Sequence, residues 1–192
     1  VDLGSEDGLP NFVNLLNNVD EAEVYGAEVE LQWSPNERTY TMLGFGWVDT
    51  EYTDFVQDDG TDFSGNKFQN APEFTFNGLV QYRFDGLGNW SVTPQLDWSF
   101  AQGYFINLAN DSFVDITPTE RYQVETDDDW DVNFRLTFES VDSAFSVTAF
   151  IEDIGENQGD ITQHYPSFDS LGTSMTNISR PETYGLTFAY EF

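Results

Sequence analysis

The stretch WSVTPQLDWSF, residues 90–100, alternates between apolar and polar side chains along its whole length. Every second residue from Trp90 to Phe100 is apolar, and the residues between them are Ser, Thr, Gln or Asp. Successive side chains of a β-strand point to opposite faces, so a period of two is typical of a strand whose faces meet different surroundings. A helix would instead repeat its apolar residues at a spacing of three or four. The pattern therefore predicts a strand over 90–100.

The same alternation recurs in other stretches, which are separated by connections of alternating length. The further stretches are 22–33, 40–52, 74–84, 130–139, 144–152 and 183–192. The short connections, rich in Gly, Pro, Asn, Asp and Ser, are 34–38, 85–89 and 140–143, and the long polar ones are 54–71, 106–129 and 153–181. Short turns at one end and long loops at the other are typical of an up-and-down antiparallel meander. We therefore expect an all-β chain of about seven long strands.

The composition excludes several classes of protein. The 192 residues include 35 Asp and Glu but 6 Lys and Arg, which gives a formal net charge of −29. Nucleic-acid binding and docking to an anionic membrane surface both need clustered cations, so neither is expected. The chain has no cysteine, which excludes disulfide scaffolds and Cys-based metal sites. The aromatic content of 17% favours β-structure, and no apolar run is long enough for a membrane-spanning helix.

Two architectures share strands of this kind. In a soluble sandwich the apolar faces pack into a core, whereas in a transmembrane barrel they meet lipid and the polar faces line the lumen. Large aromatic side chains along the apolar faces, and few charges at the centres of the polar faces, favour the barrel. The strands also approach the roughly 9–11 residues that cross a bilayer at a tilt. We therefore expect a transmembrane β-barrel.

Four motifs occur in an order that resembles the TonB-dependent outer-membrane receptors. Residues 18–31, NVDEAEVYGAEVEL, are similar to a strand of that family with the pattern N-x-G-x-A…G-x-E-x-E. Residues 70–72, NAP, resemble its return from a long loop into a strand. Residues 150–157, FIEDIGEN, resemble the end of its penultimate strand, with Asp153 where Asn is usual. Residues 180–192, RPETYGLTFAYEF, resemble its closing strand, with Arg and Pro transposed.

This resemblance implies an open fragment of a larger barrel. The family's barrel has about 22 strands and is blocked by an N-terminal plug domain. Residues 1–20 would be the end of a loop and part of a strand, and residues 21–192 would be the C-terminal part of the barrel. The short turns would be periplasmic and the long loops extracellular. We expect a curved sheet whose first strand, 22–33, and last strand, 183–192, are not joined to each other.

The resemblance also implies a function and partners. The complete receptor would lie in the outer membrane of a bacterium, in contact with its lipid, and would import a siderophore, vitamin B12 or a glycan as a small-molecule ligand. Its partners would include the missing plug domain and remaining barrel strands, the TonB energy-coupling complex and the barrel assembly machinery. The aromatic end of the chain, with Tyr190 and Phe192, resembles the signal that this machinery recognises. No cofactor, no catalysis and no nucleic-acid partner are expected.

Aromatic residues and the single histidine of the long polar stretches are the candidates for ligand contact. We select Tyr104, Phe105, Phe113, Tyr122, His164 and Tyr165. Aromatic rings on polar loops suit stacking on sugars or on siderophore rings. Packing of the same rings among the loops themselves explains them equally well.

Catalytic and metal sites have weak support in the sequence. His164 lacks a partner motif such as G-x-S-x-G, and pairs such as Glu28 and Glu30 arise by chance in so acidic a chain. The stretch DDGTD at 58–62 does not fit an EF-hand, because aligning its glycine with that of the loop places non-ligating residues at ligand positions. Weak divalent-ion binding by 58–62 or 127–129 stays open, beside the simpler interpretation of hydrated acidic loops.

Two other functions are alternatives. A complete small outer-membrane barrel with a structural or adhesion role would need an eighth strand, which only residues 11–16 could supply, and these residues alternate poorly. A soluble acidic β-sandwich that binds carbohydrate would instead bury its apolar faces. The three possibilities differ in whether the sheet closes and in whether the apolar faces pack against each other.

Overall fold

The computed structural model describes residues 19–111, 113–117, 120–123, 125–140, 145–155, 161–167, 173–178 and 180–190. The strands are β1 (Glu21–Asn36), β2 (Thr39–Asp54), β3 (Phe74–Tyr82), β4 (Phe84–Leu87), β5 (Trp90–Ala101), β6 (Phe113–Thr117), β7 (Glu120–Gln123), β8 (Asp129–Ser140), β9 (Phe145–Glu152), β10 (Ile161–Ser167), β11 (Thr173–Ile178) and β12 (Thr183–Tyr190). Within these ranges no helix is long and apolar enough to cross a membrane. The predicted all-β class is confirmed.

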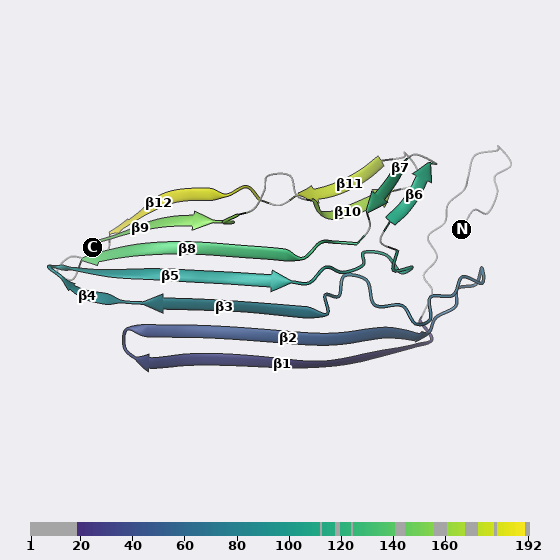
Figure 1. Ribbon diagram of the computed structural model, residues 1–192, viewed down its shortest axis with the longest axis horizontal. Helices are drawn as coiled ribbons and strands as arrows, with labels where there is room; N and C mark the ends of the chain where they lie inside the picture. Colours follow the sequence, from purple (N-terminus) through teal and green to yellow (C-terminus); the bar gives the residue numbers. More distant parts are fainter. Residues whose placement is uncertain are drawn as a thin grey trace.

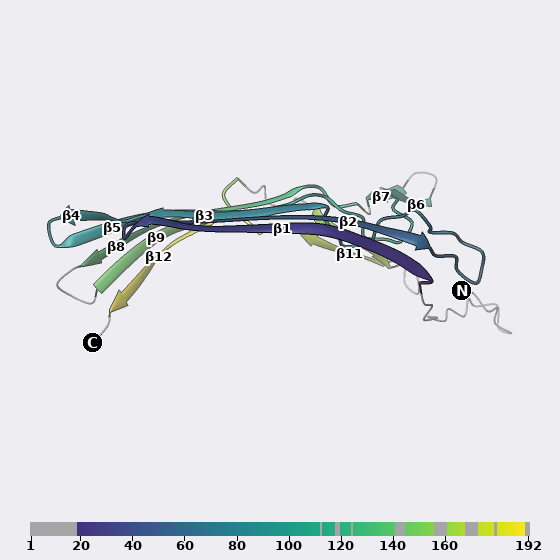
Figure 2. The same ribbon diagram turned by 90° about the horizontal axis from the view of Figure 1, so that it is seen from below.

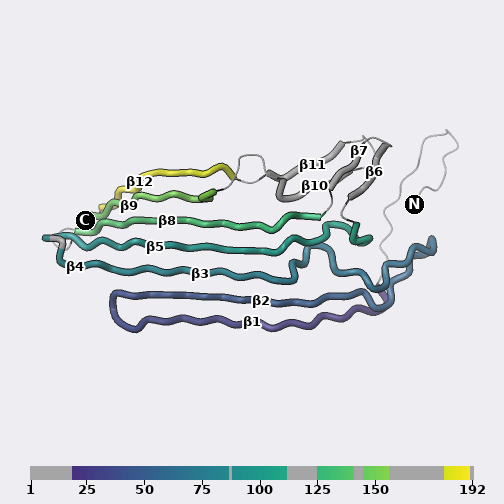
Figure 3. Tube along the Cα trace, in the orientation of Figure 1, coloured from purple at the N-terminus to yellow at the C-terminus, as the bar shows by residue number. Residues whose placement is uncertain are grey.

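Most of the strands form one antiparallel sheet. Its order is β1-β2-β3-β5-β8-β9-β12, with β4 beside β5 (Figure 1). Seen from below, the sheet is a single curved layer (Figure 2). β1 and β12 lie at opposite edges (Figure 3), and in the part of the chain that the structure describes they do not pair with each other. The expected open sheet with unjoined first and last strands is therefore confirmed.

The seven predicted long strands correspond to β1, β2, β3, β5, β8, β9 and β12. β1 and β2 have 16 residues each and extend beyond the predicted bounds at both ends. Short connections follow β1, β4 and β8, at the left of Figure 1, and we call this end of the sheet the turn end. Long connections follow β2, β5 and β9, and we call the opposite end the loop end.

One predicted strand is shorter than expected. The alternation predicts a strand over 74–84, but β3 ends two residues earlier and β4 pairs with β5 in its place. Gly86 and Gly88 have φ angles of 89° and 70°, in the left-handed region that glycine adopts without strain. Because glycine accepts these angles, the hairpin of β4 and β5 extends into residues 85–87, which were predicted to belong to a turn. Arg83, which was expected on the polar face of a strand, instead lies between β3 and β4.

Two of the predicted loops contain short hairpins. β6 pairs with β7 inside the predicted loop 106–129, and β10 pairs with β11 inside 153–181. β6 has five residues and β7 has four, and so short an alternation is hard to distinguish from a polar loop. These two long connections therefore contain short strands of their own, which lie outside the main sheet.

The strand register places the apolar residues on one face of the sheet. Phe45 pairs with Phe76, Phe76 with Phe100, and Phe100 with Trp130, so these residues form one row across four strands. The ring centroids of Phe76 and Phe100 are 5.0 Å apart, and those of Phe100 and Trp130 are 4.8 Å apart. Directly paired residues share a face of an antiparallel sheet. We call this surface the apolar face and its opposite the polar face.

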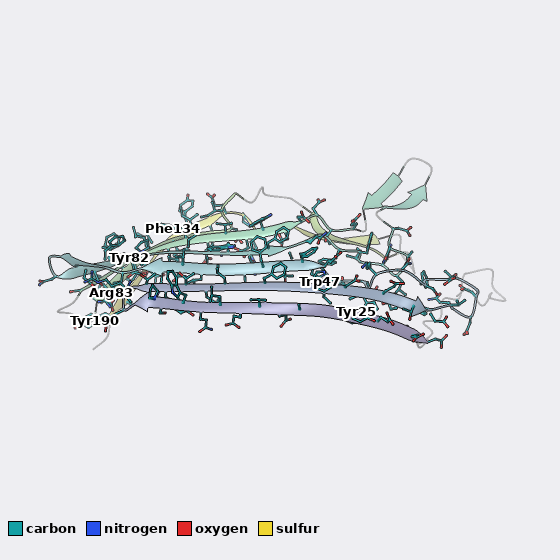
Figure 4. All side chains as sticks on the ribbon, turned by 60° about the horizontal axis from the view of Figure 1, so that its bottom comes forward. Tyr25, Trp47, Tyr82, Arg83, Phe134 and Tyr190 are labelled. Carbon is teal, nitrogen blue, oxygen red and sulfur yellow. The ribbon has the colours of Figure 1, made fainter. Side chains whose placement is uncertain are left out.

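No other described segment of the chain covers the apolar face. Leu186 and Phe188 of β12 are 62% and 64% exposed, and Val29 of β1 is 63% exposed. Figure 4 shows side chains that project from both sides of a single layer. A soluble sandwich would bury such a face beneath a second sheet. Here Phe76, Val132 and Leu186 lie on the apolar face of one open sheet and do not converge in a closed core. This wide apolar surface is typical of a contact with another apolar medium or protein.

Candidate functional site

Three segments pack together at the loop end, and we call them the loop cap. They are 55–73 between β2 and β3, 102–111 after β5, and 125–128 before β8. The cap extends the ends of β2, β3 and β5 at the right of Figure 1. Phe55 and Ile106 of the cap are 5% and 8% exposed, and Tyr52 at the end of β2 is 9% exposed. Among the described residues, these three form the buried apolar core.

Aromatic rings build this core. Tyr52 stacks on Phe68, with ring centroids 4.5 Å apart, and its ring lies 5.3 Å from that of Phe55. The ring of Phe55 lies 5.5 Å from that of Phe63. Aromatic pairs in such arrangements add about 0.5–1.5 kcal/mol beyond the burial of their surface. The connection 55–73 is therefore folded back against the end of its own strand.

Hydrogen bonds join segment 55–73 to segment 102–111. They run from Asn66 Nδ2 to the Leu108 carbonyl oxygen at 2.8 Å, from Asn70 N–H to the Phe105 carbonyl oxygen at 2.8 Å, from Lys67 N–H to Asn110 Oδ1 at 2.5 Å, and from Asn110 Nδ2 to the Lys67 carbonyl oxygen at 3.0 Å. The backbone N–H and C=O groups of irregular segments have no partners in a sheet, so hydrogen bonds from side chains satisfy them instead. The two connections thus form one folded structure.

Tyr104 and Phe105 lie in the middle of the loop cap. The Thr126 N–H donates to the Tyr104 carbonyl oxygen at 2.9 Å, and the Tyr104 N–H donates to Thr126 Oγ1 at 2.9 Å. Phe105 pairs with Glu125 in an antiparallel bridge. Both aromatic side chains are half-buried. Their backbone is held from two sides, by 55–73 and by 125–128, and both residues stay partly exposed.

Apart from the loop cap, a cluster of charged and polar side chains lies on the polar face and is centred on Arg135 of β8. Arg135 Nη1 donates to Asp97 Oδ1 at 2.8 Å and Nη2 donates to Glu152 Oε1 at 3.0 Å, so one guanidinium bridges β5 and β9. Asn133 Nδ2 donates to Asp97 Oδ2 at 3.0 Å and to Asp131 Oδ1 at 2.7 Å. This cluster is not among the site residues predicted from the sequence. The sequence feature that could have indicated it is Arg135, a rare cation at the centre of a predicted strand. The partners of Arg135 could not be predicted, because they depend on the register of three strands.

The comparison with known families agrees with this geometry. The profile of the family described as "TonB dependent receptor-like, beta-barrel" matches residues 2–154. This chain belongs to that family. The resemblance that the four sequence motifs suggested is therefore confirmed, and so is the identification of the sheet as part of a receptor barrel.

Three solved receptors share the fold of this receptor barrel. The ferric yersiniabactin uptake receptor FyuA from Yersinia pestis matches 89% of this chain, with a TM-score of 0.68 and 13% identity. From Acinetobacter baumannii, the ferric preacinetobactin receptor BauA matches 98% with a TM-score of 0.60 and 18% identity, and the siderophore receptor PiuA matches 88% with a TM-score of 0.60 and 14% identity. This chain covers 24%, 24% and 22% of FyuA, BauA and PiuA, so it spans about a quarter of their length. Identities this low show the fold alone.

Of the selected aromatic residues of the receptor barrel, the sequence neighbours Tyr104 and Phe105 lie in the loop cap. The others are placed by their backbone: Phe113 in β6 opposite Gln123, Tyr122 in β7 opposite Val114, and His164 and Tyr165 in β10 opposite Thr176 and Met175. The side chains of these four lie outside the described residues, so their role in binding stays a prediction. Tyr190 ends β12 opposite Phe145, and Phe192 lies outside the described residues.

Charged groups of the loop cap are held by local hydrogen bonds. A hydrogen bond to the Asp49 carboxylate raises the pKa of Lys67. Hydrogen bonds from Thr61 lower the pKa of Asp59, and hydrogen bonds from Ser64 lower the pKa of Asp62. In the described ranges, no group of three or more His, Asp or Glu side chains is arranged to hold a metal ion. Weak divalent-ion binding by 58–62 or 127–129 stays a prediction.

Proposed function

We propose that this chain forms the C-terminal part of the barrel of an outer-membrane receptor, with its apolar face against lipid and its polar face toward the lumen. The observation that carries this proposal is the continuous apolar face, which the register holds together across a single-layer sheet. Lipid can cover so wide a face without a second layer of protein. Membership in the TonB-dependent receptor-like family supports the same arrangement.

Aromatic side chains near both ends of the apolar face support a position across the bilayer. Phe100 and Trp130 lie toward the loop end, and the rings of Trp90 and Phe145, 6.2 Å apart, lie toward the turn end. From Trp90 to Phe100, β5 covers roughly 33 Å along the strand, or roughly 25 Å along the membrane normal at a tilt of about 40°. An apolar band of about 25 Å between aromatic girdles is typical of outer-membrane barrels.

The complete receptor would import a small-molecule ligand with energy delivered through TonB. Siderophores, vitamin B12 and glycans are the candidate classes, and the names of FyuA, BauA and PiuA make ferric siderophores the first class to test. The plug domain and the remaining strands would complete the barrel, and the assembly machinery would recognise the end with Tyr190 and Phe192. This chain would supply lumen wall and the loop cap, which binds ligand without catalysis.

Uptake by the full-length receptor tests this proposal. A bacterial host without siderophore receptors of its own would express the full-length gene, and uptake of ferric siderophores with radiolabelled iron, of cyanocobalamin and of labelled oligosaccharides would be measured. We expect the receptor in the outer-membrane fraction, and uptake of one ligand class that disappears in a host without TonB. A receptor in the soluble fraction, or uptake that persists without TonB, would contradict the proposal.

A pair of variants tests the ligand-contacting role of the loop cap. The double substitution Tyr104→Ala and Phe105→Ala removes the two half-buried rings. We expect it to raise the concentration of the transported ligand at half-maximal uptake about thirtyfold, since stacking contributes about 1 kcal/mol for each of the two rings. Phe84→Ala removes an exposed ring at the turn end and serves as the control. Equal uptake by both variants would show that the rings only pack within the cap.

A further inference from the structure

We infer that the side chain of Asn110 fastens segments 55–73 and 102–111 of the loop cap into a single unit. This inference concerns how the cap is held and does not depend on which ligand the receptor takes. The Lys67 N–H donates to Asn110 Oδ1 at 2.5 Å, and Asn110 Nδ2 donates to the Lys67 carbonyl oxygen at 3.0 Å. One carboxamide therefore binds both backbone groups of a residue 43 positions away, as a neighbouring β-strand would.

The backbone around Asn110 directs this carboxamide toward Lys67. Asn110 has a φ of 54°, in the left-handed region where Asn is enriched several-fold over other residues with side chains. Its Nδ2 group also lies 3.4 Å from the Asn107 carbonyl oxygen, and the Asp111 N–H donates to Asn107 Oδ1 at 3.2 Å. The turn from 107 to 111 is thus tied to itself on both sides of Asn110. A side chain that left this conformation would lose the contact with Lys67.

The bonds of Asn110 lie beside other hydrogen bonds between the same two segments. Asn66 binds Leu108 and Asn70 binds Phe105. The buried Ile106 lies within this contact region of the chain. Asn110 supplies two of the hydrogen bonds that join the segments. Because Tyr104 also binds Thr126, loosening of 102–111 is expected to reach segment 125–128.

Amide hydrogen exchange of the full-length receptor in detergent micelles tests the inference with two glycine variants. Asn70 has a φ of 56°, close to that of Asn110, so glycine fits both positions without backbone strain. Asn110→Gly removes the two side-chain bonds to Lys67, whereas Asn70→Gly keeps the N–H that Asn70 donates to Phe105. We expect Asn110→Gly to speed exchange of the Asn70 and Thr126 amides about tenfold, as lost hydrogen bonds lower the cost of local opening.

The control and a conservative variant decide between outcomes. Asn70→Gly should leave exchange of the Lys67 and Thr126 amides unchanged. Asn110→Asp keeps the acceptor for the Lys67 N–H but loses the donor, so it should give a smaller rise at Thr126 than Asn110→Gly. If Asn110→Gly speeds exchange at Lys67 alone, Asn110 makes only a local contact. If both glycine variants speed exchange at Thr126 equally, the effect comes from the backbone and not from the Asn110 side chain. Either result overturns the inference. If Asn110→Gly fails to assemble, Asn110→Asp decides, because an unchanged Thr126 amide would overturn the inference as well.

Discussion

At the scale of single residues, close approach of two backbone segments shapes the loop cap. Gly103 follows β5, and its N–H donates to Asp128 Oδ1 at 2.8 Å. A Cβ atom at Gly103 would lie 2.2 Å from the carbonyl oxygen of Thr126. Since that oxygen belongs to the backbone, no side-chain rotation can make room for the atom. Glycine is needed here because 102–111 and 125–128 lie in contact.

We therefore predict that Gly103→Ala loosens the loop cap. The added methyl group forces segment 125–128 away from Tyr104, at a cost of roughly 1–3 kcal/mol, as is usual for overpacking. Limited proteolysis of the full-length receptor should show faster cleavage within 102–111 while the sheet stays intact. Ala109→Ser, at an exposed position of the same segment, is the matched control. Equal resistance of Gly103→Ala and the unchanged receptor would contradict the close approach.

Asp59 and Asp62 give the tip of 55–73 a dependence on pH. Hydrogen bonds from Thr61 and Ser64 hold the pKa of each carboxyl below its ordinary value of 3.8. Their stabilising effect is therefore fully present above 3.8 and is lost as the pH falls through the folded-state pKa values. Amide exchange at Thr61 and Ser64, corrected for its intrinsic pH dependence, should rise as the pH falls below 3.8. The double variant Asp59→Asn and Asp62→Asn should show no such rise.

At the scale of elements, the register decides what each strand shows to its surroundings. Leu186 pairs with Ala149 on the apolar face, and Thr187 pairs with Thr148 on the polar face. Thr148 in turn pairs with Thr137, and the two hydroxyl oxygens lie 3.0 Å apart. Neighbouring residues of β12 therefore meet different media if the proposed orientation holds. A shift of the register by one residue would exchange the two faces.

A pair of arginine substitutions in β12 tests this assignment. Leu186→Arg places a guanidinium toward lipid near the centre of the band, at a cost of roughly 2–4 kcal/mol. Thr187→Arg places the same group toward the lumen, where water or the plug can solvate it. Heat-modifiable gel migration of the full-length receptor should show a smaller folded fraction for Leu186→Arg than for Thr187→Arg. Equal losses in the two variants would mean that the faces are wrongly assigned.

At the scale of the whole molecule, the sheet is open at both edges. β1 pairs only with β2, and β12 only with β9, in the part of the chain that the structure describes. In hydrocarbon, each unpaired backbone N–H or C=O group costs several kcal/mol. The unpaired groups of one edge strand would together outweigh a typical folding stability of about 5–15 kcal/mol. Within a complete barrel, both edges would instead pair with the neighbouring strands.

We therefore predict that residues 1–192 expressed alone cannot form a sealed barrel. In detergent, the free edges of β1 and β12 should pair with those of other copies, so the fragment should elute as large and heterogeneous assemblies. Size-exclusion chromatography with light scattering measures their mass, and the full-length receptor in the same detergent is the control. A uniform monomer with heat-modifiable migration would show that the fragment closes on itself, and would revive the small-barrel alternative.

The sequence by itself determined the strands and the chemistry of their two faces. Side chains along a strand alternate with a period of two whatever the strand packs against, so residues 90–100 and the similar stretches predicted the long strands without knowledge of their partners. The alternation of short and long connections likewise predicted the order of the sheet, since neighbours in sequence are then neighbours in space. The break between β3 and β4 at Arg83 was missed, because the alternation continues to Phe84 and does not reveal that β3 ends at Tyr82.

Only the tertiary structure decided which distant residues meet. The contact of Asn66 with Leu108 joins positions 42 residues apart, and that of Asn110 with Lys67 joins positions 43 apart. No local periodicity encodes such a pair, because it depends on how two irregular connections fold back over the same end of the sheet. The bridge of Arg135 between β5 and β9 likewise requires the register of three strands. The strand faces follow from local geometry, whereas the loop cap exists only because the folded sheet brings its segments together.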